Sequence, residues 1–467
     1  MRAKTAKKRS GGLSIVIVGC GKVGHSITEQ LVREGHDVTI VDTNPVVLRD
    51  TAEVYDVMGV GGNGASMRVL REAGIAQADM LIAVTGSDEL NLLCCTVARG
   101  ANSELSAIAR VRNPDYSEEL TYLRNQLGLS MIINPELEAA REIARLLSRP
   151  QALNISAFAK GQAELVRFKI PQDSALDGRS LIELNGILEF NYLVCAVERE
   201  GSVTIPAGSF RLRAGDDITF IASTRDVHRI FESIGMHSQA VHSCMIVGGG
   251  RSSYYLAKQL LYQHMDVKII EERASRCEEL SALLPEATVI CGNGSDEALL
   301  REEGIDSQEA FVPLTGIDEE NILMTLYAKH RVPGLKTITK INRITFNSVI
   351  DGLELGSVIY PKYITAEAII AYVRAKQNSI GSNVETLYHM FDNRVEAIEF
   401  HIREDAPVVG IPLMELNRKL KSSLLIACIN RGGKIIFPRG RDVILKDDAV
   451  IIVTTHTGFG DISDILA

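Results

Sequence analysis

Residues 15–42 read IVIVGCGKVGHSITEQLVREGHDVTIVD, and residues 244–271 read CMIVGGGRSSYYLAKQLLYQHMDVKIIE. In both stretches a short apolar run enters a glycine turn, a segment of helical period follows, and a second apolar run ends in an acid. This order of strand, glycine turn, helix and strand is typical of a dinucleotide-binding βαβ unit. The chain is therefore predicted to contain two Rossmann-like domains.

The repeat extends beyond these stretches. Gly19, Gly21 and Asp42 align with Gly248, Gly250 and Glu271 at a shift of 229 residues. At a shift of 230, GGNGASMRVLREAGI (61–75) aligns with CGNGSDEALLREEGI (291–305), and MLIAVTGSDELN (80–91) aligns with AFVPLTGIDEEN (310–321). Agreement over this length, with one single-residue slip, indicates an internal duplication.

Each copy alternates short β-branched runs with longer helical segments, which is the pattern of a doubly wound parallel sheet. Two further related segments follow the copies and are rich in short strands and Gly/Pro turns. In them Pro206 and Gly208 align with Pro438 and Gly440, and we align Asp216-Asp217 with Asp447-Asp448. The predicted fold class is α/β, with two Rossmann-like doubly wound parallel-sheet domains, each followed by a small α+β module.

A chain of 467 residues exceeds a single typical core. The boundaries that we predict are a basic tail (1–12), N-domain 1 (13–133), a linker helix (134–152), C-domain 1 (153–236), N-domain 2 (241–360), a second linker helix (361–383) and C-domain 2 (384–467).

Composition excludes several classes of protein. With 46% hydrophobic and 23% charged residues the chain is ordinary globular material. The net charge of −9 argues against nucleic acid as a partner. No apolar run is long enough to span a bilayer, and the basic start MRAKTAKKRS precedes a first strand rather than a signal-peptide core. The eight cysteines show no metal-binding spacing, so we predict no metal site and a reduced, cytoplasmic setting.

The first fingerprint has every element that a dinucleotide needs. Gly19 permits the tight turn, Gly21 lets the backbone approach a pyrophosphate, and Gly24 allows close helix packing. The helix N-terminus offers N–H groups to the phosphates. Asp42 ends the second strand, where a carboxylate binds ribose hydroxyls and repels a 2′-phosphate, which favours NAD(H) over NADP. The alternative is a glycine turn in a domain without a ligand.

Three further positions are predicted to lie at the carboxyl ends of the strands, where ligands of such sheets bind. Gly62-Asn63 could border the adenine, Thr85-Gly86 the ribose or pyrophosphate, and Arg110 the phosphate oxygens. Their alternatives are, respectively, a turn, a cap for the helix starting near Ser87, and a solvated charge.

The second fingerprint is incomplete. Gly248 and Gly250 remain, but Ser253 fills the third glycine position, which tolerates a small residue more readily than the other two. The counterparts of Asp42, Asn63, Thr85 and Arg110 are Glu271, Asn293, Thr315 and Lys340, and Arg251 and Ser252 replace Lys22 and Val23. The two loops therefore need not prefer the same ligand, and a structural, ligand-free second domain is the alternative.

No group suited to exchange a proton with a substrate accompanies either fingerprint, and the C-modules carry no nucleophile and base at a suggestive spacing. We therefore predict no catalytic residue. The layout favours sensing and assembly over an NAD-dependent oxidoreductase.

Taken together, the motifs GCGKVG, GNGAS, ADMLIAVTGSDELN and IARVRNPDY, with GGG, IIEE and CGNGSDEALLREEGI in the second half, carry a family resemblance. The chain resembles the Trk-type potassium uptake regulators with tandem RCK (regulator of K⁺ conductance) units over essentially its whole length after the basic tail. The resemblance implies a peripheral cytoplasmic protein beneath a membrane K⁺ transporter of the TrkH/TrkG type. In proteins of this kind RCK units assemble into a ring of eight beneath the transporter. Since this chain has two units, the resemblance also implies a homotetramer.

The resemblance further implies that NAD⁺/NADH, ATP or ADP in the N-domains biases transporter opening. The family's nucleotide contacts map onto Gly19, Cys20, Gly21, Lys22, Val23, Asp42, Thr85, Gly86 and Arg110, and Gly24 and Thr43 complete our first candidate site. A different cation channel or an efflux system is the alternative partner.

Overall fold

The computed structural model describes residues 12–117, 119–172, 174–184, 190–236, 241–342, 347–377, 382–391, 393–404 and 406–467. The predicted basic tail lies outside the described residues except for Gly12. The chain divides into two compact units, Met1–Ala139 with Tyr360–Ile370 and Ala140–Ile359 with Ala371–Ala467. Within the described ranges, no helix combines the length and the apolar character needed to cross a membrane.

N-domain 1 is built on a six-stranded sheet in the order β3-β2-β1-β4-β5-β6, and all of its pairings are parallel. Its strands are β1 (Ser14–Val18), β2 (Asp37–Asp42), β3 (Met58–Gly61), β4 (Met80–Ala83), β5 (Ser106–Arg110) and β6 (Met131–Ile133). The strand order reverses between β1 and β4, and ligands of doubly wound sheets bind beside this reversal.

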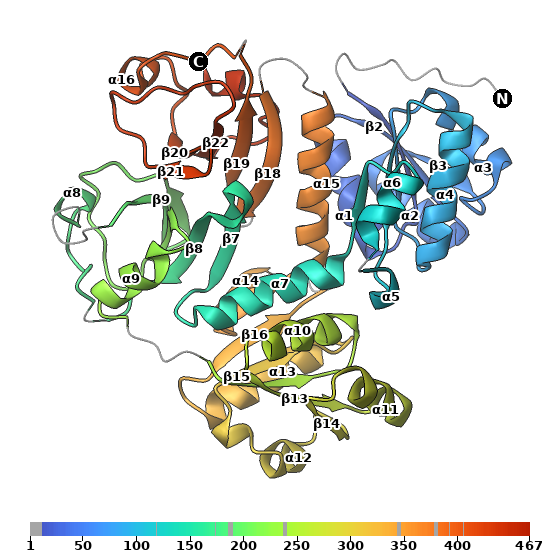
Figure 1. Cartoon of the computed structure of the whole chain (residues 1–467), viewed down its shortest axis with the longest axis horizontal. Coiled ribbons are helices and arrows are strands. Elements are labelled where there is room, and N and C mark those ends of the chain that lie inside the picture. Colours follow the sequence, from blue (N-terminus) through green and yellow to red (C-terminus); the bar gives the residue numbers. More distant parts are fainter. Residues whose placement is uncertain are drawn as a thin grey trace. The chain divides into compact units, whose positions relative to one another are not determined.

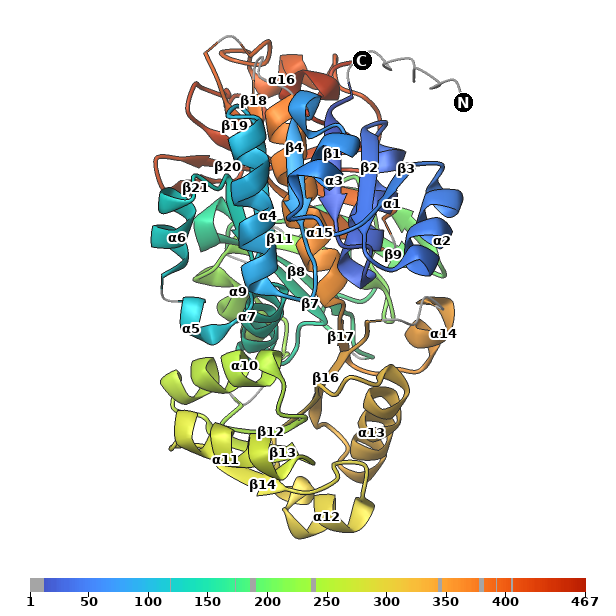
Figure 2. The ribbon, with the colours of Figure 1, turned by 90° about the vertical axis from the view of Figure 1, so that its right-hand side faces the viewer.

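Helices lie on both faces of this sheet (Figure 2). They are α1 (Lys22–Arg33), α2 (Pro45–Tyr55), α3 (Met67–Glu72), α4 (Asp88–Ala101), α5 (Pro114–Ser117) and α6 (Leu120–Gln126). Residues of α3 and α4 share one hydrophobic core with the sheet, while α1 contacts α2. N-cap residues define where two of these helices begin. The side chains of Asn44 and Ser87 accept hydrogen bonds from backbone N–H groups in the first turns of α2 and α4.

N-domain 2 repeats this plan with the sheet order β14-β13-β12-β15-β16-β17. Its strands are β12 (Ser243–Val247), β13 (Asp266–Glu271), β14 (Thr288–Cys291), β15 (Ala310–Pro313), β16 (Lys336–Lys340) and β17 (Ser357–Ile359). Its helices are α10 (Arg251–Tyr262), α11 (Ala274–Leu283), α12 (Glu297–Glu302), α13 (Asp318–Arg331) and α14 (Asn347–Gly352). The identical strand order confirms the prediction of two Rossmann-like domains.

The two C-modules are five-stranded antiparallel sheets with matching orders, β10-β9-β11-β8-β7 and β21-β20-β22-β19-β18 (Figure 1). C-domain 1 contains β7 (Asn154–Phe158), β8 (Ala163–Lys169), β9 (Tyr192–Arg199), β10 (Ser202–Thr204), β11 (Asp217–Ser223), α8 (Leu181–Leu184) and α9 (Asp226–Ser233). C-domain 2 contains β18 (Ser382–Met390), β19 (Val395–Ile402), β20 (Leu424–Arg431), β21 (Lys434–Ile436), β22 (Ala449–Thr454) and α16 (Leu413–Leu416). This confirms the small α+β modules.

One detail of the sequence alignment between the modules was wrong. Asp216 accepts two hydrogen bonds from Arg199, both at 2.7 Å, and Asp448 accepts two from Arg431, both at 2.8 Å. Asp216 is therefore equivalent to Asp448 and not to Asp447. Asp447 takes the place of Gly215, and both have positive φ, at 64° and 88°. The Arg–Asp pairs show which aspartates correspond, and their shift of 232 residues is the one that also relates Pro206 to Pro438.

The two C-modules share a hydrophobic core. Leu165, Cys195 and Ile221 of the first module and Ala397 and Ile451 of the second belong to one cluster of buried side chains. Polar contacts accompany it: the backbone N–H of Ala159 donates to Glu399 at 3.0 Å, and Arg394 donates to the carbonyl of Gly201 at 2.6 Å. The duplicated modules thus pair within one chain.

The segments predicted as linker helices contain α7 (Pro135–Ser148) and α15 (Pro361–Gln377). β18 begins at Ser382, inside the range 361–383 that we had predicted as helix.

After α7, the chain is fastened to N-domain 2 by a buried lysine. Lys336 Nζ donates to the carbonyl oxygens of Pro150 at 3.0 Å and Ala152 at 2.6 Å, and to Ser357 Oγ at 3.1 Å. Burial lowers the pKa of Lys336 from 10.5 to about 7. Its position links strand β16 to the start of C-domain 1.

This lysine should make stability depend on pH. Between pH 7 and 10.5 the unfolded chain keeps the Lys336 proton while the folded chain loses it. The unfolded state then binds more protons, so the free energy of unfolding should rise with pH over this range. In Lys336→Met this contribution to the rise should be lost, whereas exposed Lys434→Met should keep it. Urea unfolding at pH 7, 8 and 9 measures the slope, and equal slopes in all three proteins would contradict the prediction.

Candidate nucleotide sites

The first glycine turn leads from β1 into α1. Gly19 has φ +102°, and a Cβ there would lie 2.9 Å from the backbone nitrogen of Thr85, so both conformation and space demand glycine. At Gly24 a Cβ would lie 1.9 Å from the carbonyl oxygen of Gly19. A Cβ at Gly21 would have no such neighbouring atom within 4 Å. Two of the glycines are thus needed for packing, and the third faces open space beside the helix N-terminus.

Asp42 holds this turn in place. Its carboxylate accepts hydrogen bonds from the backbone N–H groups of Cys20 at 2.7 Å and Asn44 at 2.8 Å. The carbonyl of Asp42 accepts from Gly62 N at 2.9 Å, which brings the third strand's turn to the same edge. The acid that sequence reasoning assigned to ribose therefore also connects the glycine turn with the end of β2.

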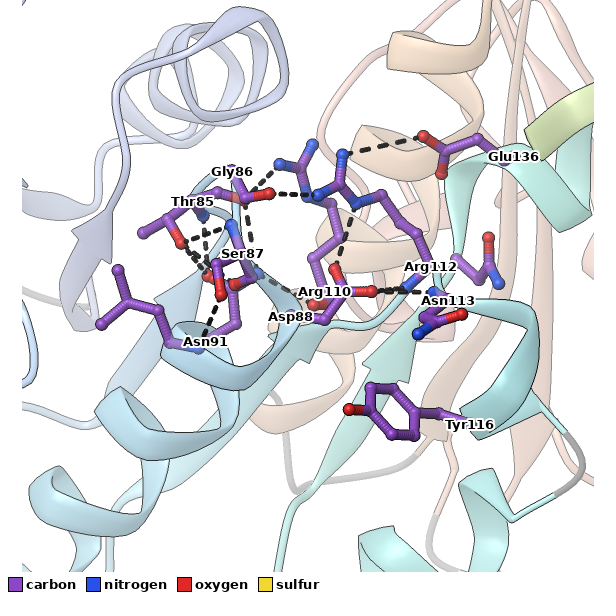
Figure 3. A network of polar contacts seen from close by, with 12 residues as sticks. Thr85, Gly86, Ser87, Asp88, Asn91, Arg110, Arg112, Asn113, Tyr116 and Glu136 are labelled. Atoms are coloured by element: carbon purple, nitrogen blue, oxygen red, sulfur yellow. Dashed lines mark hydrogen bonds and ion pairs between the residues drawn. The ribbon is translucent and has the colours of Figure 1, made fainter. Parts of the chain in front are cut away.

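Thr85, Asn91 and Arg110 form one network across the ends of β4 and β5 (Figure 3). The buried Asn91 side chain accepts from both the backbone nitrogen and the hydroxyl of Thr85, each at 2.7 Å, and donates to the carbonyl of Arg110 at 2.9 Å. The Arg110 guanidinium donates to the carbonyl of Thr85. The structure brings Thr85 and Arg110 together, and the polar groups named above bond to each other and to Asn91.

Asp88 forms the second half of this network (Figure 3). Its buried carboxylate accepts from the backbone nitrogens of Arg112 at 2.7 Å and Asn113 at 2.8 Å, and it pairs with the Arg112 side chain at 3.1 Å. Arg112 in turn donates to the carbonyl of Gly86 at 2.5 Å. The loop that carries Thr85 and Gly86 is therefore fixed at both ends.

The Gly62-Asn63 segment is a tight turn. The Asn63 side chain accepts from Ala65 N at 2.9 Å, which supports the turn alternative for this residue. A Cβ on Gly64 would lie 2.2 Å from Val18, and one on the equivalent Gly294 would lie 2.1 Å from Val247. The second glycine of each GNG motif is thus explained by close packing against the first strand of its domain.

In N-domain 2 the glycine turn forms hydrogen bonds with two side chains. Gly249 N donates to the Glu271 carboxylate at 2.6 Å, and the Gly249 carbonyl accepts from Arg276 Nε at 2.7 Å. Arg273 pairs with Glu271 at 2.9 Å. Although burial opposes it, hydrogen bonds from Gly249 and Arg273 lower the pKa of Glu271. N-domain 1 has Val47 and Asn44 at the positions of these two arginines.

The remaining second-site residues mirror the first site. Asn321 accepts from Thr315 N at 3.0 Å and donates to the carbonyl of Lys340 at 3.0 Å, as Asn91 does with Thr85 and Arg110. Lys340 Nζ donates to the carbonyl of Leu314 at 2.5 Å. Asn293 accepts from Ser295 N at 2.8 Å, again as a turn residue.

The loop side chains differ in exposure. Lys22, Thr43 and Arg251 are exposed, Val23 is partly exposed, and Ser252 and Ser253 are buried. Gly250, like Gly21, faces open space, whereas the Gly248 Cβ position lies 3.1 Å from Thr315 N. Burial and the charge of Asp42 raise the pKa of the Cys20 thiol to about 12, so this thiol stays protonated near neutral pH. Among the described residues no cluster of three or more His, Cys, Asp or Glu could hold a metal ion.

Sequence reasoning missed four residues that organise these sites, namely Asp88, Asn91, Asp318 and Asn321. Asp318 accepts from the backbone nitrogen of Asn342 at 3.0 Å, as Asp88 does from that of Arg112. All four residues are buried, at 4%, 0%, 1% and 0% exposure. The signal was present, because TGSDELN and TGIDEEN keep the same Asp and Asn in both copies. A buried polar group that recurs at one position of a repeat points to a shared structural hydrogen bond.

The TrkA-N domain model matches residues 15–135 and 244–361, and the TrkA-C domain model matches residues 165–235 and 397–467. The chain is 32% identical over 443 residues to the Trk system potassium uptake protein TrkA of Haemophilus influenzae, covering 94% of this chain and 95% of that protein. The TrkA of Vibrio alginolyticus is 32% identical over 458 residues, covering 97% and 98%. The chain belongs to the TrkA family.

Membership of the TrkA family confirms the resemblance stated above. The family is one of potassium uptake proteins, which also confirms the prediction that the chain is not an enzyme. Among solved structures, the GsuK RCK domain superposes with a TM-score of 0.63 at 17% identity, covering 97% of this chain and 94% of that one. The GsuK channel bound to NAD has a TM-score of 0.62 at 18% identity, covering 97% and 78%. These structures share the tandem RCK fold.

Proposed function

We propose that this TrkA-family chain is the nucleotide-sensing regulatory subunit of a Trk-type potassium uptake system. The observation that carries the proposal is the first glycine turn, in which Gly21 faces open space at the start of α1 while Asp42 ends the adjacent strand. The first-turn N–H groups of a helix have no intrahelical acceptors and attract phosphate. An adenine dinucleotide, NAD(H), fits this arrangement, and ADP or ATP would share its phosphate and ribose contacts.

The membrane partner and assembly follow from the family. The Haemophilus and Vibrio relatives are named as parts of Trk potassium uptake systems. We infer that this chain acts at the cytoplasmic face of the membrane on a transporter of the TrkH/TrkG type. Two RCK units per chain support a ring of four chains. Nucleotide would shift this ring only through a difference in affinity between its states, for which about 1 to 3 kcal/mol per site is typical.

Four measurements test the proposal, two of the Trk assignment and two of nucleotide binding without turnover. The full chain should co-purify with a TrkH-type membrane protein, and it should restore K⁺ uptake in a strain that lacks its own Trk regulator. Calorimetric titration with NADH, ADP and ATP should show binding, and NADH absorbance should remain unchanged in the presence of candidate oxidoreductase substrates. Failure of both the co-purification and the rescue would refute the Trk assignment.

Replacing Asp42 should weaken nucleotide binding at the first site. Asp42→Ala removes the charge that would accept ribose hydroxyls and also the acceptor for Cys20 N–H, so we expect a loss of affinity of about tenfold to a hundredfold, or roughly 1.4 to 2.7 kcal/mol. Asp42→Asn retains one acceptor oxygen and should lose less. Titration calorimetry gives the affinities, and circular dichroism checks the fold. Unchanged affinity in a folded Asp42→Ala protein would show that this carboxylate does not bind the ribose.

A further inference from the structure

Two cysteines lie beside the acid of the second glycine fingerprint. Cys291 ends β14 and pairs with Glu271 in the parallel register of β13 and β14. Cys277 belongs to α11, which contacts both of these strands (Figures 1 and 2). The Cys277 thiol donates to the carbonyl of Glu271 at 3.2 Å, and the Cys291 thiol lies 3.9 Å from the carbonyl of Glu272. Both sulfurs therefore lie over the same turn of backbone.

The two thiols also lie close enough to influence each other's titration. Burial, and after it a hydrogen bond between the two side chains, raises the pKa of Cys277 to about 11. All eight cysteines of the chain are free thiols, and Cys291 alone among them is exposed. One member of the pair is thus accessible to a reagent from solvent, and the other is buried.

The first copy supplies a natural comparison. Leu48 is equivalent to Cys277, and Gly61, which pairs with Asp42, is equivalent to Cys291. A Cβ on Gly61 would lie 3.9 Å from the Leu48 side chain. Side chains at these two positions therefore face each other in this fold, and only the second copy places a thiol at both.

We propose that Cys277 and Cys291 are a redox modification site, oxidised by peroxide to an intramolecular disulfide that links α11 to β14. Exposed Cys291 attacks one peroxide oxygen as the thiolate, the O–O bond breaks, and Cys291 sulfenic acid and water form. The Cys277 sulfur then attacks the Cys291 sulfur. The S–S bond forms, and the departing hydroxide takes the Cys277 proton as a second water. The two thiols lose two electrons and two protons, and hydrogen peroxide is reduced to two waters.

The disulfide would affect the glycine turn through contacts that α11 and Glu271 already make with it. Forming the bond draws the two sulfurs to about 2.05 Å and removes the thiol proton that Cys277 donates to Glu271. Arg276, the neighbour of Cys277 on α11, holds the carbonyl of Gly249, and Glu271 holds its N–H. A shift of α11 is therefore transmitted to both hydrogen bonds that fix Gly249. This consequence for nucleotide affinity rests on the proposed function, whereas the disulfide itself does not.

The chemistry is tested on the full-length wild-type chain. After treatment with hydrogen peroxide and quenching, denatured protein should titrate six free thiols instead of eight. Non-reducing peptide mapping should find Cys277 linked to Cys291, and dithiothreitol should restore all eight thiols. Cys291→Gly and Cys277→Leu, which carry the residues of the first copy, should form no internal link, and Cys277→Leu should leave a Cys291 sulfenic acid that dimedone traps.

Three outcomes would overturn the proposal. The first is an unchanged thiol count, the second is a link between two chains through Cys291, and the third is overoxidation of Cys291 while Cys277 stays reduced. Each counts at peroxide concentrations that oxidise a control dithiol. The effect on the turn is read separately by hydrogen–deuterium exchange of peptides covering 248–255, which should exchange faster in the oxidised protein. If NADH, ADP and ATP protect neither glycine turn in reduced protein while the disulfide forms, the nucleotide function fails and the redox site stands.

Discussion

Gly24→Ala is expected to destabilise N-domain 1 by about 2 to 3 kcal/mol, because the new methyl group would overlap a carbonyl that cannot move freely. The Cβ position lies 1.9 Å from the oxygen of Gly19, whose own backbone abuts Thr85. Relief requires α1 to move away from the turn, which would displace the N–H groups offered to phosphate. Nucleotide binding at the first site should therefore fall by more than about tenfold.

Gly21→Ala is the matched control for this variant. Gly21 has φ −68° and ψ −173°, a conformation that alanine adopts readily, and open space surrounds it. Its stability should change by no more than about 0.5 kcal/mol, while its methyl group should still obstruct an approaching phosphate. Urea unfolding and calorimetric titration separate the two variants. Equal stability of Gly24→Ala and wild type would show that the first turn relaxes to accommodate a side chain, as the second does for Ser253.

Asn91→Ala is expected to cost about 3 kcal/mol, since each buried group left without a partner costs about 1 to 3 kcal/mol. The amide and hydroxyl of Thr85 and the carbonyl of Arg110 all form hydrogen bonds with this side chain. The substitution removes these three hydrogen bonds at once. The carboxyl ends of β4 and β5 should separate more readily, and nucleotide affinity should fall with them.

The effect of Asn91→Ala is measured by urea unfolding and by hydrogen–deuterium exchange of peptides covering residues 80–91 and 106–113. Asn125→Ala, an exposed asparagine of the same domain, is the control and should behave as wild type. If exchange in both peptides were unchanged in Asn91→Ala, the network would not hold the two strands together. The second copy offers a replicate, because Asn321→Ala should produce the same change in the peptides around Thr315 and Lys340.

The fold was largely predictable from the sequence because its signals are local and occur twice. β-branched runs, glycine turns and helical periods each depend on neighbouring residues, and the duplication tests every assignment against a second copy. The alignment of Asp216 was wrong because it matched the adjacent aspartates as a pair instead of keeping the shift of 232 residues between Pro206 and Pro438. The hydrogen bonds from Arg199 to Asp216 revealed the error.

The candidate sites were only partly predictable. The sequence alone determined the fold class, the duplication, the family resemblance and the positions of the glycine turns and their acids. The tertiary structure decided what each polar group does there: Asp42 holds the turn, Asn63 forms its own turn, and Asn91 joins Thr85 to Arg110. It also brought Cys277 and Cys291, which lie on different elements, to the neighbouring carbonyls of Glu271 and Glu272. Hydrogen bonds between residues far apart in the chain depend on which strands are neighbours in the sheet. The hydrophobic periodicity of the sequence does not contain that information.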